Sequence, residues 1–157
     1  MTARAILALD LGTKLGWALR HADGRIESGM ENFAPSASEG EGLRFLRFRA
    51  WLHDTKRRLE TAGETLALVQ WERNDFLNPG AFAAAVSFGM RAHLQAWCEH
   101  HKIPYPGTHS ATIKKAVTGS GHAKKPAVRA AMRKLGFAPG STDEADALAL
   151  LHTGAAA

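Results

Sequence analysis

The sequence predicts an α/β domain in which helices pack on a mixed sheet. Its apolar segments follow the order three strands, helix, strand, helix, strand and then helices, which indicates such a sheet. Two of the strand segments end on a carboxylate, Asp10 and Glu72, where ligands gather in open α/β sheets. The chain has 157 residues, 45% of them hydrophobic, so we expect one domain with its own core, residues 1–157.

The first strand is expected over residues 5–10, an apolar run that ends on Asp10. The run is too short for a membrane span and too continuous for a half-exposed strand, so it predicts a strand buried on both faces. Gly12 and Gly16 let the chain turn back so that Trp17-Ala18-Leu19 can pair antiparallel with it. Burying the Asp10 carboxylate is costly without a cationic partner, and a metal ion is one such partner. The alternative is that Asp10 only caps a turn.

Turn residues and prolines mark the other strands. Asp23-Gly24 is a hairpin signal and predicts a third strand from Arg25 to about Phe33. Residues 66–71 form the next apolar strand, directly before Glu72. Residues 103–106 contain two prolines, so we expect an edge strand there because proline cannot donate to a ladder.

Helices are expected where apolar residues recur every three or four positions. One of them begins at Asn78-Pro79 and has small residues around Gly89 that another helix can approach. Its apolar stripe consists of Phe82, Val86, Met90, Leu94 and Trp97. Ser141 to Glu144 read as a capping box. The expected helices cover residues 41–61, 79–101, 111–117, 126–135 and 141–152, and Thr108 or Ser110 can cap the third.

Basic residues are concentrated in one segment of the chain. Residues 100–142 contain eight Lys and Arg and no Asp or Glu, whereas the whole chain has a net charge of +5, so the remainder is net negative. Such a block suggests a polyanionic partner. The alternative is a solvated basic face without a ligand.

Composition excludes several classes of protein. Cys98 is the single cysteine, which excludes an intrachain disulfide and a four-cysteine zinc site. No apolar run approaches the roughly 20 residues of a membrane helix, and the N-terminus does not read as a secretory leader. We therefore expect a cytoplasmic protein without a membrane partner.

Four carboxylates stand where they are unfavourable for stability. Asp10 and Glu72 lie at strand ends. Asp143 and Asp146 are spaced i, i+3 in the last helix, so they share one face about 5–6 Å apart at Cβ. Clustered carboxylates repel one another unless divalent cations neutralise them, and oxygen ligands suit Mg²⁺ or Mn²⁺. Two such ions can activate a water and stabilise the leaving oxygen of a phosphodiester. Asp143 has an alternative role, because acids complement the dipole at a helix N-terminus.

Four short motifs follow one another along the chain: Asp10-Leu-Gly-Thr-x-x-Gly-Trp-Ala, Glu72 after an apolar strand, Lys114-Lys-Ala-Val-Thr-Gly with Lys124 or Lys125 shortly after, and Asp143-x-x-Asp146-Ala-Leu-Ala. Each motif is weak alone, but the ordered set resembles the RuvC-type Holliday-junction resolvases over nearly the whole chain. The resemblance implies a ribonuclease-H-like fold, a mixed five-stranded sheet with helices on both faces. It also implies a homodimer with two active sites and Mg²⁺-dependent paired nicking of four-way DNA junctions, which leaves 5′-phosphate and 3′-hydroxyl ends.

Carried over by position, the resemblance assigns metal-binding and DNA-binding roles. Two Mg²⁺ ions, for which Mn²⁺ can substitute, would be bound at each active site by Asp10, Glu72, Asp143 and Asp146. Lys125, or its neighbour Lys124, would be the active-site lysine. Phe76 would wedge against a base at the junction centre, or else it only anchors the next helix. The full set of expected DNA contacts is Phe76, Lys114, Lys115, His122, Lys124, Lys125 and Arg129.

Some assignments stay open at this stage. Asp75 and Glu144 adjoin the expected ligands and could replace one of them. His122 either contacts the junction or takes part in catalysis, or it is an ordinary loop residue. The helix over residues 79–101 is the expected dimer surface, and its alternative role is packing on the sheet.

Three other functions compete with the resolvase. The Asp-x-Gly-Thr opening also occurs in actin-like and sugar-kinase-like ATP-binding proteins, but a second hairpin of this type is missing. A nuclease of the same fold, of the YqgF type that processes RNA or one for general branched DNA, shares the opening. Glu72 and the Lys114-Lys115 pair favour the resolvase over it. A catalytically silent junction-binding protein would not need all four candidate ligands.

Overall fold

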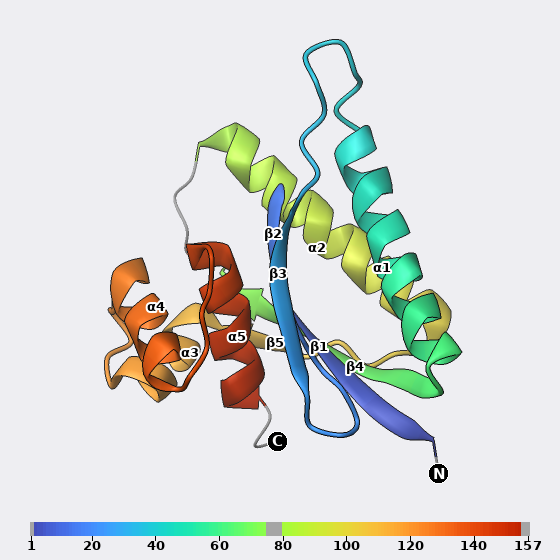
Figure 1. The fold of residues 1–157 in the computed structure, drawn as a ribbon. Helices are drawn as coiled ribbons and strands as arrows, with labels where there is room; N and C mark the ends of the chain where they lie inside the picture. The colour runs from blue at the N-terminus through green and yellow to red at the C-terminus, as the bar shows by residue number, and fades with distance from the viewer. Residues whose placement is uncertain (1, 75–79, 155–157) are drawn as a thin grey trace.

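The sheet is mixed, as the sequence predicts. The computed structural model describes residues 2–74 and 80–154, and in this part of the chain five strands form one sheet in the order β3-β2-β1-β4-β5 (Figure 1). β1, β2 and β3 pair antiparallel, while β4 runs parallel to β1 and β5 parallel to β4. The strands are β1 (Ala3–Asp10), β2 (Lys14–Arg20), β3 (Ile26–Asn32), β4 (Glu64–Arg73) and β5 (Gly107–His109).

The hairpin of β1 and β2 forms at the predicted turn. Leu9 pairs with Trp17 and Asp10 with Gly16. The next turn passes through Gly24 at φ 89°, a conformation that glycine adopts without a Cβ penalty. β1 lies between β2 and β4, and its residues Leu7, Ala8 and Leu9 are fully buried, as expected of a strand covered on both faces.

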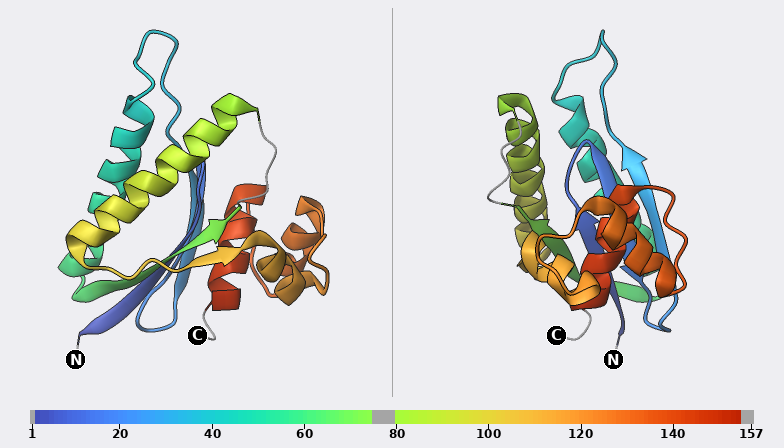
Figure 2. Two further views of the ribbon diagram at one scale, coloured as in Figure 1. Left: turned by 180° about the vertical axis from the view of Figure 1, so that it is seen from behind. Right: turned by 90° about the vertical axis from the view of Figure 1, so that its left-hand side faces the viewer.

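Helices cover both faces of the sheet (Figure 2). On the face with Leu7 and Leu9, the core is completed by α1 (Leu43–Thr61) and α2 (Ala81–His101). On the face with Ala8 and Ala18, it is completed by α3 (Ser110–Thr118), α4 (Lys125–Lys134) and α5 (Thr142–Gly154). The small alanine side chains leave room for α5 to lie directly against β1 and β2.

Two predictions about the end of the sheet are wrong in detail. The edge strand is β5, residues 107–109, and not residues 103–106. The carbonyls of Pro104 and Pro106 still accept hydrogen bonds from β4, but proline has no N–H to return. Neither Thr108 nor Ser110 caps the next helix, because Thr108 belongs to β5 and α3 begins after His109 without any side-chain cap.

The apolar stripe of α2 packs on the sheet. Met90 and Leu94 are fully buried, whereas Phe82, which the pattern placed in the same stripe, is 58% exposed. The small-residue centre is approached by α1, since a Cβ on Gly89 would lie 2.6 Å from the Phe45 ring. The predicted start of this helix at Asn78-Pro79 lies outside the described residues.

The last helix begins close to the predicted position. Ser141 Oγ accepts a hydrogen bond from the Glu144 N–H at 3.1 Å, which is one half of a capping box. The Glu144 carboxylate makes other contacts, described below. No helix within residues 2–74 and 80–154 combines the length and the apolar character that crossing a membrane requires.

Candidate active site

Two neighbouring parallel strands bring Asp10 and Glu72 together. Asp10 is the last residue of β1, and Glu72 is the last but one of β4. The residues directly before them, Leu9 and Trp71, are paired in the parallel ladder. The carboxyl ends of parallel strands meet at one edge of a sheet. Both carboxylates therefore lie at the same edge of the sheet.

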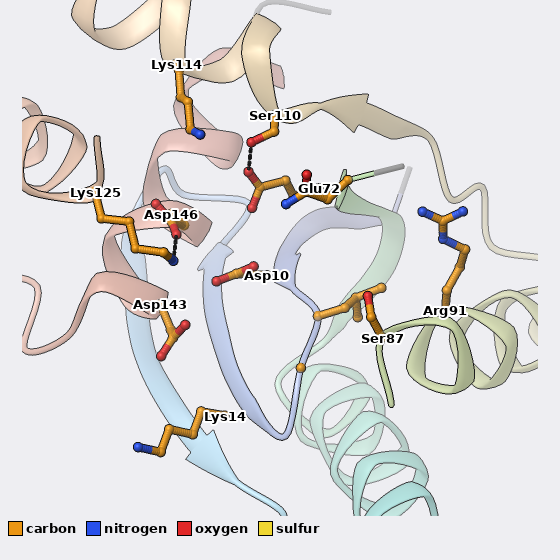
Figure 3. A pocket seen from close by; sticks show the side chains of 13 residues that line it. Asp10, Lys14, Glu72, Ser87, Arg91, Ser110, Lys114, Lys125, Asp143 and Asp146 are labelled. Atoms are coloured by element: carbon orange, nitrogen blue, oxygen red, sulfur yellow. Dashed lines mark hydrogen bonds and ion pairs between the residues drawn. The ribbon is translucent and has the colours of Figure 1, made fainter. Parts of the chain in front are cut away.

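Helix α5 adds a third carboxylate to this space. Its first turn packs against β2 at Gly16, where an added Cβ would lie 1.8 Å from the carbonyl oxygen of Asp143. Only glycine permits this approach. Asp10, Glu72 and Asp146 then offer carboxylate oxygens that lie within 4.8 Å of one another (Figure 3). We call these three side chains the acidic triad, and among the described residues they form the group that could hold a metal ion.

The acidic triad lies in a cleft of about 300 Å³. Asp143 faces the same cleft from one helical turn before Asp146 but is outside the triad. Of the described residues, the cleft is lined by Asp10, Leu11, Gly12, Lys14, Glu72, Asn74, Ser87, Arg91, Ser110, Lys114, Lys125, Asp143 and Asp146.

Negative charge is costly in the acidic triad. Burial raises the pKa of Asp10 well above its ordinary value, and the neighbouring Glu72 and Asp146 carboxylates raise it further. The pKa of Asp146 is raised first by burial and then by Glu72, although Lys125 opposes this shift. A divalent cation between these oxygens would relieve both causes, so the residues present fit a hard metal ion.

Two lysines border the acidic triad from the basic segment. Lys125 Nζ, at the start of α4, donates to Asp146 Oδ2 at 3.0 Å, and Lys114 of α3 lines the cleft nearby (Figure 3). Burial alone would lower the pKa of Lys125, but the Asp146 carboxylate, together with Asp10 and Asp143, outweighs burial and the pKa is raised. Lys125 therefore stays charged beside the acids.

Three residues of the cleft were not predicted from the sequence as part of a site. Ser110 Oγ donates to Glu72 Oε1 at 2.7 Å and so orients that carboxylate. Arg91 of α2 stands over the Trp71 ring at 4.7 Å and lines the cleft on the side away from Lys125 (Figure 3). The sequence holds no signal for Arg91, because its helix reads as an apolar stripe that packs on the sheet. Lys14, at the start of β2, also lines the cleft, and the sequence analysis assigned it no role.

The remaining predicted DNA contacts are not among the described lining residues of the cleft. Three of them are exposed, one on α3 and two in the loop between α3 and α4, and the fourth, Arg129 of α4, donates to the Pro139 carbonyl at 3.0 Å. Contact with DNA at these positions stays a prediction. Phe76 and Asp75 lie outside the described residues. The exposed three are Lys115, His122 and Lys124.

Comparison with known proteins identifies the fold. No protein-family model and no curated protein matches the sequence. Among solved structures, RuvC of Thermus thermophilus in complex with a Holliday-junction substrate superposes with a TM-score of 0.75 over 96% of this chain and 92% of that chain, at 23% identity. A second Thermus thermophilus RuvC structure gives a TM-score of 0.68 over 96% and 93%, at 24% identity.

A more distant structure shares the same architecture. The yeast mitochondrial Holliday junction resolvase Ydc2 superposes with a TM-score of 0.53 over 97% of this chain and 78% of that chain, at 11% identity. The chain thus has the fold of the RuvC resolvases, and the predicted ribonuclease-H-like α/β class, with a mixed five-stranded sheet and helices on both faces, is confirmed.

Proposed function

We propose that this protein is a metal-dependent endodeoxyribonuclease that resolves four-way DNA junctions by paired nicking. The observation that carries the proposal is the acidic triad, in which three carboxylates from β1, β4 and α5 converge within 4.8 Å beside a charged lysine. Structural proteins gain nothing from such a cluster, because burial and mutual repulsion oppose it. The RuvC fold of the chain supports the choice of nuclease chemistry.

Asp10, Glu72 and Asp146 would hold the metal, with Asp143 as a further ligand from the same helix face. Bound there, two Mg²⁺ ions, or Mn²⁺ in their place, supply the positive charge that activates water and stabilises the leaving oxygen. The protein's own part is to hold these oxygens in place. Ser110 does so for Glu72, since its hydroxyl leaves only the other lone pairs of that carboxylate free for a cation.

Lys125 and Lys114 would bind the phosphate next to the metal ligands. Lys125 is tied to Asp146 and its pKa is raised, so it brings a full positive charge to the edge of the triad. A phosphodiester gains negative charge during hydrolysis, and fixed cations stabilise that charge. The other basic residues proposed to contact DNA are Lys115, His122, Lys124 and Arg129, together with the aromatic Phe76.

The branched substrate and the homodimer belong together in this proposal. The Thermus RuvC structure of the same fold is a complex with a Holliday junction, and paired nicking needs two active sites. Helix α2 offers a surface for a second copy, because Ala85, Phe88, Ala92 and Ala96 are exposed at helical spacing. The protein would act as a single domain, in the cytoplasm.

A cleavage assay on a synthetic four-way junction tests the proposal. We expect Mg²⁺-dependent, symmetrically paired nicks with 5′-phosphate ends, and much slower cutting of duplex DNA and structured RNA. Asp146→Asn should abolish nicking and still bind the junction, because it removes one metal ligand and leaves the basic residues in place. Equal cutting of duplex or RNA would instead assign another nuclease of this fold. Unchanged nicking by Asp146→Asn would remove the proposed active site.

A further inference from the structure

We propose that Glu144 is a positioning residue that fastens the first turn of α5 and thereby sets where Asp143 and Asp146 lie. The inference rests on the proposed metal site. It also decides an alternative that the sequence left open, since Glu144 adjoins two candidate ligands and has the same carboxylate chemistry.

Both carboxylate oxygens of Glu144 are already engaged within the chain. Glu144 Oε2 accepts a hydrogen bond from Ser28 Oγ at 2.7 Å, and Glu144 Oε1 accepts one from the Gly140 N–H at 2.9 Å. The Glu144 N–H donates to Ser141 Oγ at 3.1 Å. Glu144 is also absent from the described residues that line the cleft and from the acidic triad, so its side chain serves as an anchor and not as a ligand.

The anchor joins α5 to a rigid part of the molecule. Ser28 belongs to β3 and is opposite Ala18 of β2 in the antiparallel ladder, so its place is determined by the sheet. Gly140 precedes the helix in the chain. Glu144 therefore ties three separate segments together: the sheet edge, the loop and the first helical turn.

Two contacts together restrict the start of α5. At Gly16 the backbone of Asp143 lies directly against β2, which sets how close the helix comes to the sheet. That contact does not prevent the helix from rotating about its axis. The Glu144–Ser28 hydrogen bond acts on a neighbouring side of the first turn and opposes such rotation. Asp143 directly precedes Glu144, and Asp146 follows two residues later, so both ligands turn with it.

The test compares Glu144→Ala with Glu144→Gln in the full chain. Glutamine can keep both contacts, because its oxygen accepts from the Gly140 N–H and its amide donates to the Ser28 hydroxyl. Mn²⁺ affinity is measured by isothermal titration calorimetry, and nicking is measured over a range of Mn²⁺ concentrations. We expect Glu144→Ala to weaken Mn²⁺ binding on the order of tenfold, as loss of supporting contacts around metal ligands does. Its nicking should recover in part at high Mn²⁺, and Glu144→Gln should behave like the wild type.

A matched control is Glu39→Ala. Glu39 likewise accepts one backbone N–H, from Ser36 at 2.8 Å, and one side-chain donor, from Arg47 at 2.6 Å, but it belongs to the exposed loop before α1. This change should leave Mn²⁺ affinity unaltered. Ser28→Ala removes only one of the two anchoring bonds and should give a smaller loss in the same direction as Glu144→Ala.

Three results would overturn the inference. The first is wild-type Mn²⁺ affinity in Glu144→Ala. The second, if that variant does not fold, is wild-type Mn²⁺ affinity in Ser28→Ala. The third is an equal loss of Mn²⁺ affinity in Glu144→Gln and Glu144→Ala. The last would mean that the charge of Glu144 matters and not its hydrogen bonds. Should the wild type bind Mn²⁺ without cutting the junction, the proposed function fails, and the Mn²⁺ titrations still decide the role of Glu144.

Discussion

Two carboxylates of the cleft are held by hydrogen-bond donors. Ser110 donates to Glu72, and Lys125 donates to Asp146, while burial and three neighbouring acids raise the pKa of Asp10. A divalent cation bound there would relieve the repulsion that the metal-free state leaves between these carboxylates. The lysine reduces that repulsion and brings positive charge to the place where a phosphate would bind.

Lys125→Ala should slow junction nicking by about 100-fold, the scale of losing one preorganised charge partner of the transition state. Junction binding should weaken less and lose part of its dependence on salt. Single-turnover nicking at saturating Mg²⁺ measures the first effect. Lys56→Ala, on α1 and away from the lining residues of the cleft, is the control and should cut at the wild-type rate. A Lys125→Ala rate within twofold of the wild type would exclude this residue from the reaction.

Packing between elements determines how the carboxylates of the acidic triad converge. α5 lies on the sheet face with Ala8 and Ala18, and its first turn touches β2 at Gly16. Two parallel strands alone would bring together only Asp10 and Glu72. The third carboxylate depends on how closely a helix can approach a strand.

Gly16→Ala should push the first turn of α5 away from β2. The added methyl would overlap the Asp143 carbonyl, and we expect a loss of about 1–3 kcal/mol in the free energy of unfolding, as for other overpacked sites. Nicking should fall more than the loss of stability suggests, because the two proposed ligands on α5, Asp143 and Asp146, would move with the helix. Urea unfolding and nicking assays measure the two effects. Gly40→Ala adds its Cβ where no atom lies within 4 Å and should change neither. Unimpaired nicking in a stable Gly16→Ala protein would contradict this role of the contact.

The outer side of α2 should carry the dimer contact. Phe88 is 54% exposed on this helix, and Phe88→Glu places a charge in the proposed interface. We expect a dimeric wild type and a folded, monomeric variant by size-exclusion chromatography with light scattering. Leu135→Glu, at an exposed position that follows α4 on the other face of the sheet, should remain dimeric. A dimeric Phe88→Glu protein would move the interface elsewhere.

At the scale of the whole molecule, the acidic triad should lower the stability of the metal-free protein. A carboxyl group whose pKa is raised on folding binds its proton more tightly in the folded state. The free energy of unfolding therefore falls as pH rises from the pKa of the unfolded state through the raised pKa of the folded state. Asp10 is this case. Metal-free wild type should therefore lose stability as pH increases through that window, and a bound divalent ion should restore it.

Asp10→Asn should remove this penalty. In EDTA near neutral pH we expect it to unfold about 2–4 °C above the wild type, equivalent to about 1 kcal/mol for a chain of this size. It should also lose the rise in Tm that Mg²⁺ produces in the wild type, and it should not nick. Differential scanning calorimetry with EDTA and with Mg²⁺ measures both. If Asp10→Asn unfolds at a lower temperature than the wild type in EDTA, the charge of Asp10 does not destabilise the metal-free fold.

Local patterns in the sequence were sufficient for much of the fold. The apolar run before Asp10, the Asp23-Gly24 turn and the helical stripes predicted strands and helices that the structure contains. Each of these signals arises from neighbouring residues along the chain. The edge strand was misplaced because proline carbonyls pair with β4 one step before the ladder proper begins at Gly107.

The sequence by itself determined the order of strands and helices, the four candidate carboxylates and the basic segment, because periodicity, turn residues and charge are properties of short stretches. Only the tertiary structure decided that Ser110 orients Glu72, that Arg91 borders the cleft and that Glu144 is bonded to Ser28. These contacts join residues far apart in the chain. They depend on which faces of the sheet and helices come to pack together, and the spacing of residues along the sequence does not specify that packing.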